Sequence, residues 1–591
     1  MHGSAWNSGE SVRIPFDTGY TRTGPLTVGQ ANMRRCVLRD EPAHMNACVI
    51  RKLPDAVGID RIAEAVHTLV LRHESLRTTY PKQPELRQEL AATGSFTLFV
   101  HAAQGDPLAH ARALGDQMRA VRFAPETELP IRLVVVTVDG VPDRIVFVMC
   151  HIAVDAGALD LINHEWDALM AGRPLPEPGA RQPVSLALDE QSEAGRRRLA
   201  ASLRYWESVL RSTPQSMFAI PGVDRTDWMH PRLRIRSVAA ADALPAITER
   251  TGASGSNLVL AALCVLLGRR LDQSTIVMAT PAANRIASEF AEYVGTVAQD
   301  ALFSVSLADA ESFDEVVTRT RSRAFTALRH SRFDYEDLAP VIGKVEHERG
   351  SHWARDCVFN DLTGLELEGL LAPTPVPAAD AATSAAVADD LRLDWFQPES
   401  MMTRLMVWVV RLDGEMELAL WADPKCLPPE DAEELAGDLV RLLVAAADGD
   451  VPLGRLAELS RLPRVERGEG WYEIDSCLIE LAAVRALLNE VLGDRPHLVE
   501  AVADPQLGHR LECWLTADGE NGDVESDVAA VHAACLEGLR HRRLAAMAPH
   551  RYLVVDRVPD DPGSAASWQA RRLLAEGTGR VQPAVAVAVG R

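Results

Sequence analysis

The stretch FVMCHIAVDAGALD, residues 147–160, places a histidine directly after a run of apolar, strand-forming residues and an aspartate four positions later. A neutral imidazole accepts a proton near physiological pH, so His151 is suited to general-base chemistry on an amine or a hydroxyl. With helical spacing, Asp155 would share a face with His151. Two interpretations stay open at this point: a structural histidine beneath an ordinary turn, and an imidazole that reaches a substrate.

The elements around His151 set its position. Residues 131–138 and 144–150 are β-branched runs on either side of DGVPD, which predicts a hairpin. The residues at 156–172 have apolar positions at helical spacing. His151 is therefore expected at a junction between a strand and a helix, where a side chain can project into a cleft. Cys150, the last residue of the strand, is a poor candidate for a nucleophile because it is buried and has no base but its neighbour.

The composition narrows the class of protein. A net charge of −22 argues against a nucleic-acid partner, which requires a basic face. The sequence contains no apolar run of the roughly 18 residues needed for a membrane span, and the N-terminus lacks the layout of a secretory signal. The nine cysteines include no C-x-x-C pair, which argues against a zinc site or a disulfide framework. We therefore expect a cytoplasmic protein without a bound metal.

The length of 591 residues is too great for one core and predicts three units of structure. Helix and strand patterns alternate over 24–182 and again over 183–458, after an N-terminal extension at 1–23. A polar, aperiodic linker follows at 459–470. Residues 471–580 are then expected to form a small α+β domain, with a tail at 581–591. The fold class is α/β, with α+β character.

Several further segments occur in a particular order along the chain. They are PLTVGQANM (25–33), LRHESLRTTY (71–80), MCHIAVDAG (149–157), LRYWESVL (203–210), VMATPAANR (277–285), YVGTVAQDAL (293–302) and RHSRFDYEDL (329–338). Each resembles, in the same order, a motif of the condensation domains of nonribosomal peptide synthetases. The resemblance covers residues 24–455. Its strength lies in this collinearity, because a histidine and an acid four residues apart often occur by chance.

The resemblance implies two lobes, each like chloramphenicol acetyltransferase, that form a V around a central tunnel. It implies that His151 is the catalytic residue and that an amine attacks a donor thioester. The donor acyl group would be carried on the phosphopantetheine arm of a carrier protein, and no cofactor would be bound directly. Because neither a carrier motif nor a thioesterase motif is found, we expect carrier proteins to act in trans, with a free or carrier-bound amine as acceptor.

The chain departs from the family motif H-H-x-x-x-D-G in two places. Cys150 replaces the first histidine, and Ala156 replaces the glycine, with Gly157 one place later. The resemblance also implies that Asp155 forms a structural ion pair with an arginine of the LRHESLRTTY segment. Arg77 is the first choice for this arginine and Arg72 the second.

Two further residues are expected to contact substrate. VGTVAQD (294–300) stands where the family has I-G-x-F-V-N-T, so Gln299 replaces an asparagine, and Thr296 lies in the same segment. The tunnel floor built from this segment is therefore expected to be shaped for an unusual substrate.

The last unit resembles the C-terminal subdomain of adenylation domains, through APHRYLVVDRVPDDPGSAASWQARRLL (548–574). Ser564 occupies the place of the lysine that would touch an acyl phosphate, and the large nucleotide-binding half has no counterpart. We therefore expect a docking or bracing role rather than adenylation.

The sequence favours a condensation enzyme of secondary metabolism that forms an amide. Two alternatives stay open. One is an acyltransferase that uses coenzyme A thioesters or forms esters. The other is a catalytically silent module that recruits carrier or tailoring proteins, an alternative motivated by the changes at Cys150 and Ala156.

Overall fold

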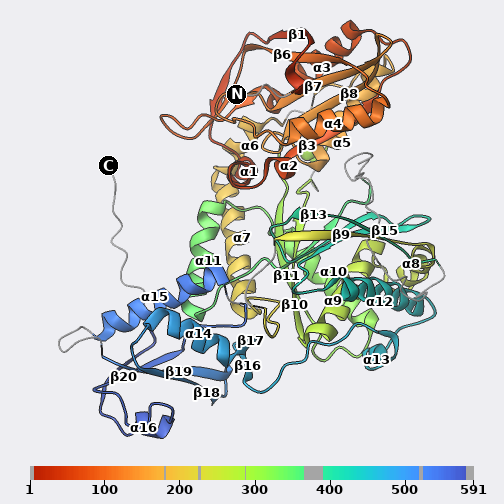
Figure 1. Ribbon diagram of the computed structural model, residues 1–591. Coiled ribbons are helices and arrows are strands. Elements are labelled where there is room, and N and C mark those ends of the chain that lie inside the picture. Colours follow the sequence, from red (N-terminus) through yellow and green to blue (C-terminus); the bar gives the residue numbers. More distant parts are fainter. Residues whose placement is uncertain are drawn as a thin grey trace.

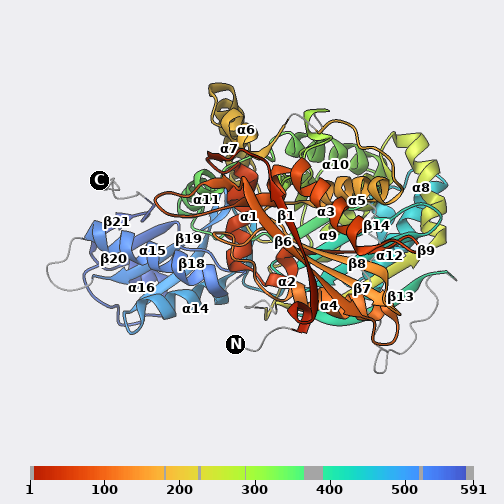
Figure 2. The same ribbon diagram turned by 90° about the horizontal axis from the view of Figure 1, so that it is seen from above.

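A computed structural model describes residues 5–178, 181–223, 228–285, 288–364, 390–517, 524–542 and 544–580. The chain forms three units, each around its own sheet: an N-lobe, a C-lobe and a C-terminal unit (Figure 1). Viewed from above, the N-lobe overlies the C-lobe and the C-terminal unit lies to one side (Figure 2). The expected tail at 581–591 lies outside the described residues.

The N-lobe contains a five-stranded sheet in the order β1-β6-β7-β8-β3. These strands are β1 (Glu10–Asp17), β3 (Asn46–Lys52), β6 (Thr93–Ala102), β7 (Ile131–Val138) and β8 (Val141–Cys150). Helix α4 (Pro107–Arg119) packs on one face, and α3 (Ile59–Arg72) with α5 (Ala156–Met170) on the other. Burial on both faces explains the unbroken β-branched run at 131–138. The predicted hairpin is confirmed as the antiparallel pair β7–β8.

Shorter elements complete this lobe. They are η1 (Ala5–Asn7), β2 (Arg22–Gly24), α1 (Val28–Arg39), α2 (Pro42–Met45), η2 (Glu74–Arg77), β4 (Thr78–Thr79), β5 (Gln88–Leu90) and α6 (Pro183–Glu190). The prediction of a separate N-terminal extension is wrong for β1, which pairs along its whole length with β6. Helix α6, directly after the predicted boundary at residue 182, contacts both β2 of the N-lobe and α7 of the C-lobe.

The C-lobe contains a seven-stranded sheet in the order β11-β10-β12-β14-β15-β9-β13. These strands are β9 (Met229–Ser237), β10 (Thr275–Ala282), β11 (Gln299–Ser306), β12 (Cys357–Asp361), β13 (Arg392–Ser400), β14 (Leu405–Arg411) and β15 (Met416–Ala422). The helices of this lobe are α7 (Glu193–Ser212), α8 (Val238–Thr251), α9 (Gly255–Leu271), η3 (Ser288–Phe290), α10 (Phe313–Leu328), α11 (Tyr335–Arg349), α12 (Pro429–Ala447), η4 (Leu453–Arg455) and α13 (Leu456–Leu459).

Helices α8, α9, α10 and α12 pack together against one face of this sheet and enclose the largest core of the molecule. Helix α9 is apolar on all sides because it is buried on all sides. Among the described helices, none alone is long and apolar enough to cross a membrane, although the bent pair α8–α9 passes that test as a pair.

The C-terminal unit contains β16 (Trp471–Ile474), β17 (Cys477–Glu480), β18 (His497–Asp504), β19 (Gly508–Thr516), β20 (Arg551–Val555) and β21 (Leu573–Gly577). Helices α14 (Leu481–Leu492) and α15 (Val524–Arg542) pack against each other beside this sheet, and α16 (Ala565–Gln569) precedes β21. The predicted α+β character of this unit is confirmed.

Arg349, at the end of α11, joins the C-terminal unit to the C-lobe. Its Nε donates to Asp475 at 2.6 Å, and its Nη1 donates to the carbonyls of Leu210 and Thr213, both also at 2.6 Å. The linker before this unit is aperiodic, as predicted, yet it lies along the C-lobe, with the Val465 amide 2.7 Å from the Arg270 carbonyl. The C-terminal unit is thus attached by a buried arginine as well as by the chain.

Candidate active site

His151 lies in the turn between β8 and α5, as predicted. Its amide donates to the Met45 carbonyl at 3.0 Å, which fixes the backbone at the end of the strand. The side chain is half-buried, and its Nδ1 is buried without a hydrogen-bond partner among the described residues. An imidazole that lacks an internal partner remains available to accept or donate a proton.

Cys150 is the last residue of β8 and packs inside the core beneath α4. Burial raises the pKa of its thiol to about 12. The thiolate, which is the nucleophilic form of cysteine, is therefore scarce at neutral pH. Cys150 fills space behind His151, which agrees with the expectation that it is not a nucleophile.

Asp155 caps the N-terminus of α5 and also binds the C-lobe. Its Oδ1 accepts from the Ala158 amide at 2.9 Å and from Arg285 Nη2 at 2.6 Å. Its Oδ2 accepts from the amides of Val297 and Ala298 at 2.9 and 3.2 Å. The carboxylate, only 2% exposed, is thus fully occupied away from His151. No described contact joins Asp155 to His151, so the geometry gives no support to a His–Asp relay.

Arg285 binds the loop that precedes β11 as well as Asp155. It donates to the carbonyls of Phe290, Tyr293 and Gly295 at 2.7 to 3.0 Å. Gly157 makes room for this side chain, because a Cβ there would lie 2.5 Å from Arg285 Nε and 2.6 Å from its Cδ. The glycine is thus required one position after the family's glycine, and Ala156 simply begins α5.

The prediction that Asp155 pairs with Arg77 or Arg72 is wrong. Arg77 is fully buried and donates to the Ala91 carbonyl and the Tyr20 hydroxyl at 2.9 and 2.8 Å. Both arginines lie in the N-lobe and neither contacts Asp155, whose carboxylate binds Arg285 and the C-lobe loop before β11.

Arg72 has a different partner inside the N-lobe. Its Nε lies 2.6 Å from Glu165 Oε1, on helix α5. The actual partner of Asp155 is Arg285, which the sequence analysis did not single out. A signal for it exists in the sequence, because Arg285 is the last residue of the segment VMATPAANR, which carries part of the family resemblance.

Thr296 lies in the loop that Asp155 binds, and Gln299 is the first residue of β11, directly after that loop. The Gln299 amide Nε2 donates to the Phe333 carbonyl at 2.7 Å, and its Oε1 accepts from the Phe333 amide at 3.3 Å. Thr296 is fully buried, and its carbonyl approaches Gly29 of α1 so closely that a Cβ would lie 2.3 Å away. Both residues have internal structural roles, and a role in binding substrate stays a prediction.

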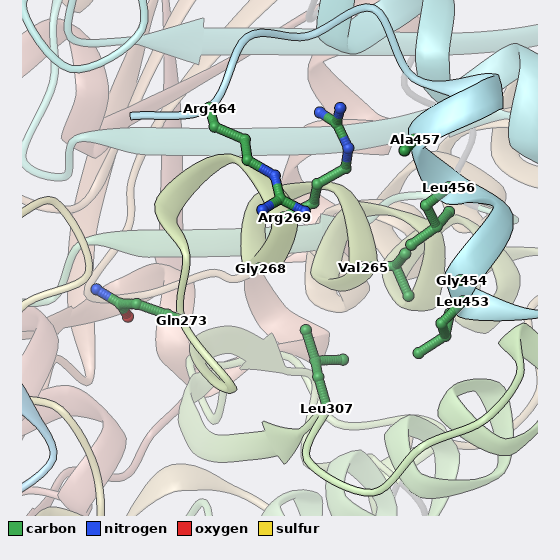
Figure 3. A pocket seen from close by; sticks show the side chains of 10 residues that line it. All are labelled: Val265, Gly268, Arg269, Gln273, Leu307, Leu453, Gly454, Leu456, Ala457 and Arg464. Carbon is green, nitrogen blue, oxygen red and sulfur yellow. The ribbon is translucent and has the colours of Figure 1, made fainter. Parts of the chain in front are cut away.

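A cavity of about 300 Å³ lies on the C-lobe, between α9, η4 and α13. Figure 3 shows Arg269 and Arg464 at one end of it and Val265, Leu307, Leu453 and Leu456 around the remainder. All of its lining residues belong to the C-lobe and the linker, so it is separate from His151. Within the described part of the chain, no group of three or more His, Cys, Asp or Glu side chains is arranged to hold a metal.

The comparisons with known proteins agree with this geometry. The family model described as "Condensation domain" matches residues 25–354. The chain belongs to the condensation-domain family. The match includes His151, Asp155 and Arg285.

Among sequence relatives, surfactin synthase subunit 2 of Bacillus subtilis (strain 168) is 23% identical over 492 residues, which cover 80% of this chain and 13% of that protein. The curated relatives are much longer than this chain, which spans from 5% to 13% of their lengths.

Two solved structures show the same fold. The first condensation domain of the calcium-dependent antibiotic synthetase, in complex with a substrate analogue, has a TM-score of 0.54 and 17% identity. The alignment covers 74% of this chain and 98% of that one. The X-domain from teicoplanin biosynthesis has a TM-score of 0.54 and 20% identity, over 73% of this chain and 96% of that one. The C-terminal unit remains unidentified by these comparisons.

Proposed function

We propose that this condensation-domain protein forms an amide by attack of an amine on an acyl or aminoacyl thioester. The thioester is carried on the phosphopantetheine arm of a carrier protein. The two lobes form a V, and the donor and the amine reach His151 through a tunnel between them. The observation that carries the proposal is the His151 imidazole, half-buried at the strand–helix junction, whose Nδ1 has no partner among the described residues. It lies four residues before Asp155, which with Arg285 holds the loop before β11.

The proposed chemistry requires only one proton-accepting group. The amine nitrogen forms a bond to the thioester carbon, and the resulting tetrahedral species loses one N–H proton to His151. The C–S bond then breaks, and His151 returns the proton to the leaving thiolate, so that the imidazole is regenerated. A thioester is already activated, so holding both reactants close together contributes a large share of the acceleration. His151 acts as the base or as an acceptor that orients the amine.

The test uses the full chain, a donor carrier protein loaded with an acyl or aminoacyl group, and a panel of amines. Product formation is followed by mass spectrometry, with His151→Ala as the matched control. We expect an amide product that depends on the carrier. Equal rates with the corresponding coenzyme A thioester would favour the alternative of a coenzyme A-dependent acyltransferase, and product from alcohols alone would favour ester formation.

A second candidate function is recruitment of carrier or tailoring proteins without catalysis. Two observations favour it: the changes at Cys150 and Ala156, and the likeness to the X-domain of teicoplanin biosynthesis, which has been solved in complex with OxyB. This candidate predicts tight binding of a carrier protein without turnover, and the same binding by His151→Ala.

A further inference from the structure

A row of four side chains crosses the C-lobe sheet. Met406 on β14 pairs with Trp421 on β15, Trp421 pairs with Arg232 on β9, and Arg232 pairs with Phe396 on β13. Residues that are directly paired across strands point to the same face of a sheet. The result is a continuous row of side chains in which one arginine lies between aromatic and thioether groups.

This row lies on the face opposite to the main helical core. The alternate residues Val407, Leu420 and Leu233 belong to the core under α8, α9 and α12. Figure 1 shows β9, β13 and β15 between these helices and the N-lobe. In Figure 2 the N-lobe lies above the same sheet. The row therefore belongs to the face of the C-lobe that is directed toward the N-lobe.

Arg232 has no hydrogen-bond partner among the described residues. It is 5% exposed, and its Nη2 is buried without a partner. The nearest carboxylate oxygen, Oε1 of Glu399, is 3.9 Å away, which is too long for a hydrogen bond, and that side chain is 38% exposed. The guanidinium lies over the Phe396 ring, 4.2 Å from its centroid. Burial lowers the pKa of Arg232, as expected for a charge that lacks a close counter-ion.

Two neutral hydrogen-bond donors beside Arg232 also lack a partner among the described residues. The indole Nε1 atoms of Trp421 and Trp408 are both buried and have no partner in the part of the chain that the structure describes. The two indole rings are 4.8 Å apart, and Arg232 lies 5.7 Å from the Trp421 ring. Arg232, Trp421 and Trp408 are thus successive neighbours across the sheet, and each has a buried donor without an acceptor among the described residues.

Such an arrangement destabilises the folded protein unless an acceptor forms hydrogen bonds with these donors. A buried polar group without a partner destabilises the folded state, and a buried charge without a close counter-ion does so more strongly. A water molecule can satisfy a single N–H group but cannot neutralise the guanidinium. We propose that this face of the C-lobe binds the oxyanion of a carboxylate or phosphate, with Arg232 as the principal contact and Trp421 and Trp408 as additional donors.

The surroundings indicate that the anion belongs to a molecule with an apolar body. Met406 and Trp408 are only half-buried and border the donors, so they offer apolar contact surface. The site is distinct from the candidate active site. Asp155 binds the loop that leads into β11, and β15 is the fourth strand along the sheet from β11. At a strand spacing of about 4.8 Å, Trp421 lies about 19 Å away along the sheet.

The experiment is isothermal titration of the full chain with two pairs of probes. Hexanoate is compared with hexanamide, and 4′-phosphopantetheine with pantetheine. Each pair differs only in the anionic group, and the pair that binds distinguishes a carboxylate-bearing substrate from the phosphate of a carrier arm. We expect at least one anion to bind ten-fold or more tightly than its neutral partner, and Arg232→Met to abolish that preference.

Arg234→Gln is the matched control. Arg234 lies two residues further along β9, is paired with Asp394 at 2.8 Å, and leaves Asp394 paired with Arg236 when it is replaced. This variant should keep the preference for the anion. Thermal melting separates a binding role from a structural one: without ligand, Arg232→Met should keep or raise the Tm, because it removes a buried charge whose only counter-ion among the described residues, Glu399, is 3.9 Å away.

Equal affinity for anion and neutral partner in both pairs would overturn the proposal, as would a large drop in Tm for Arg232→Met without any loss of the preference. His151→Ala should bind the probes as the wild type does. Failure of the proposed catalysis and failure of this site are therefore distinguishable.

Discussion

Asp155 in the N-lobe and Arg285 in the C-lobe form an ion pair across the two lobes, with Arg285 Nη2 2.6 Å from Asp155 Oδ1. The same carboxylate caps α5, directly after the turn that contains His151, and accepts two amides of the loop before β11. The pair therefore fixes the position of the candidate catalytic turn relative to the C-lobe. Its role is structural, and it acts on His151 only through the backbone.

Replacement of Asp155 should damage the fold as well as the rate. Asp155→Ala leaves Arg285 and two loop amides without their acceptor, and loss of one partner of a buried pair costs about 3–5 kcal/mol. We expect a clear fall in Tm together with a loss of activity, measured by calorimetry and by the carrier assay. Arg285→Gln should have a similar effect, and the double variant should lose less than the sum of the two.

Asp167→Ala serves as the comparison for Asp155→Ala. Asp167 pairs with Arg51 near the surface, where its side chain is 45% exposed, so its loss should cost less than about 1 kcal/mol. A well-folded Asp155→Ala variant with normal Tm and slow turnover would instead support a His–Asp relay.

A methyl group at position 157 should disturb the same ion pair. In Gly157→Ala the new Cβ would lie 2.5 Å from Arg285 Nε, so the arginine must move away from Asp155. We expect a loss of about 1–3 kcal/mol in the free energy of unfolding, measured by urea denaturation. Gly343→Ala in α11 is the control: no atom lies within 4 Å of its Cβ position, and removal of a helical glycine should be neutral or stabilising. Equal stability of both variants would contradict the close contact.

The sequence predicted the elements around His151 because their signals are local. The hairpin β7–β8 and helix α5 follow from β-branched runs and helical periodicity within residues 131–170, without reference to distant residues. The partner of Asp155 could not be predicted in this way. Arg285 lies 130 residues away in sequence, and only the packing of the two lobes brings it to Asp155.

The pairing of the first strand, β1, likewise could not be predicted from local sequence signals. β1 lies at the edge of the N-lobe sheet, where it pairs with β6 and has exposed residues along one side. Such a strand carries a weak apolar pattern, so the sequence alone does not distinguish it from an extension. The clustering of unpaired hydrogen-bond donors around Arg232 depends on the register of the strands, which the sequence alone does not specify.

The Cys150 thiol should be unreactive in the native protein. Burial raises its pKa to about 12, and it lies in the core beneath α4. With a thiol reagent at pH 8 we expect slow modification of the native chain and reaction of all nine cysteines after denaturation. Cys150→Ala should retain turnover within a few-fold. Rapid native labelling of Cys150, or loss of turnover in Cys150→Ala with an unchanged Tm, would show that the thiol takes part in the chemistry.

The C-terminal unit should loosen as the pH falls. His532 is fully buried on α15, and burial lowers its pKa from 6.5 to about 4. Its Nε2 donates to the His347 carbonyl of α11 at 2.9 Å. Because the folded pKa lies below the unfolded one, the stability is fully present above pH 6.5 and is lost as the pH falls toward 4. The limiting effect is about 3 kcal/mol.

Urea denaturation at pH 7.5 and pH 5 measures this dependence. His532→Gln can keep the donor to His347 and does not titrate, so it should show a smaller loss between the two pH values than the wild type. His164→Gln, at an exposed position, should behave as the wild type does. An unchanged pH dependence in His532→Gln would assign the effect to other groups.

The proton-accepting role of His151 is tested most directly by a single-turnover rate of amide formation from a loaded donor carrier, compared between the wild type and His151→Ala. We predict that the variant keeps the wild-type Tm and carrier affinity while its rate falls by about 10²-fold or more. Amide formation at the wild-type rate in His151→Ala would contradict the account.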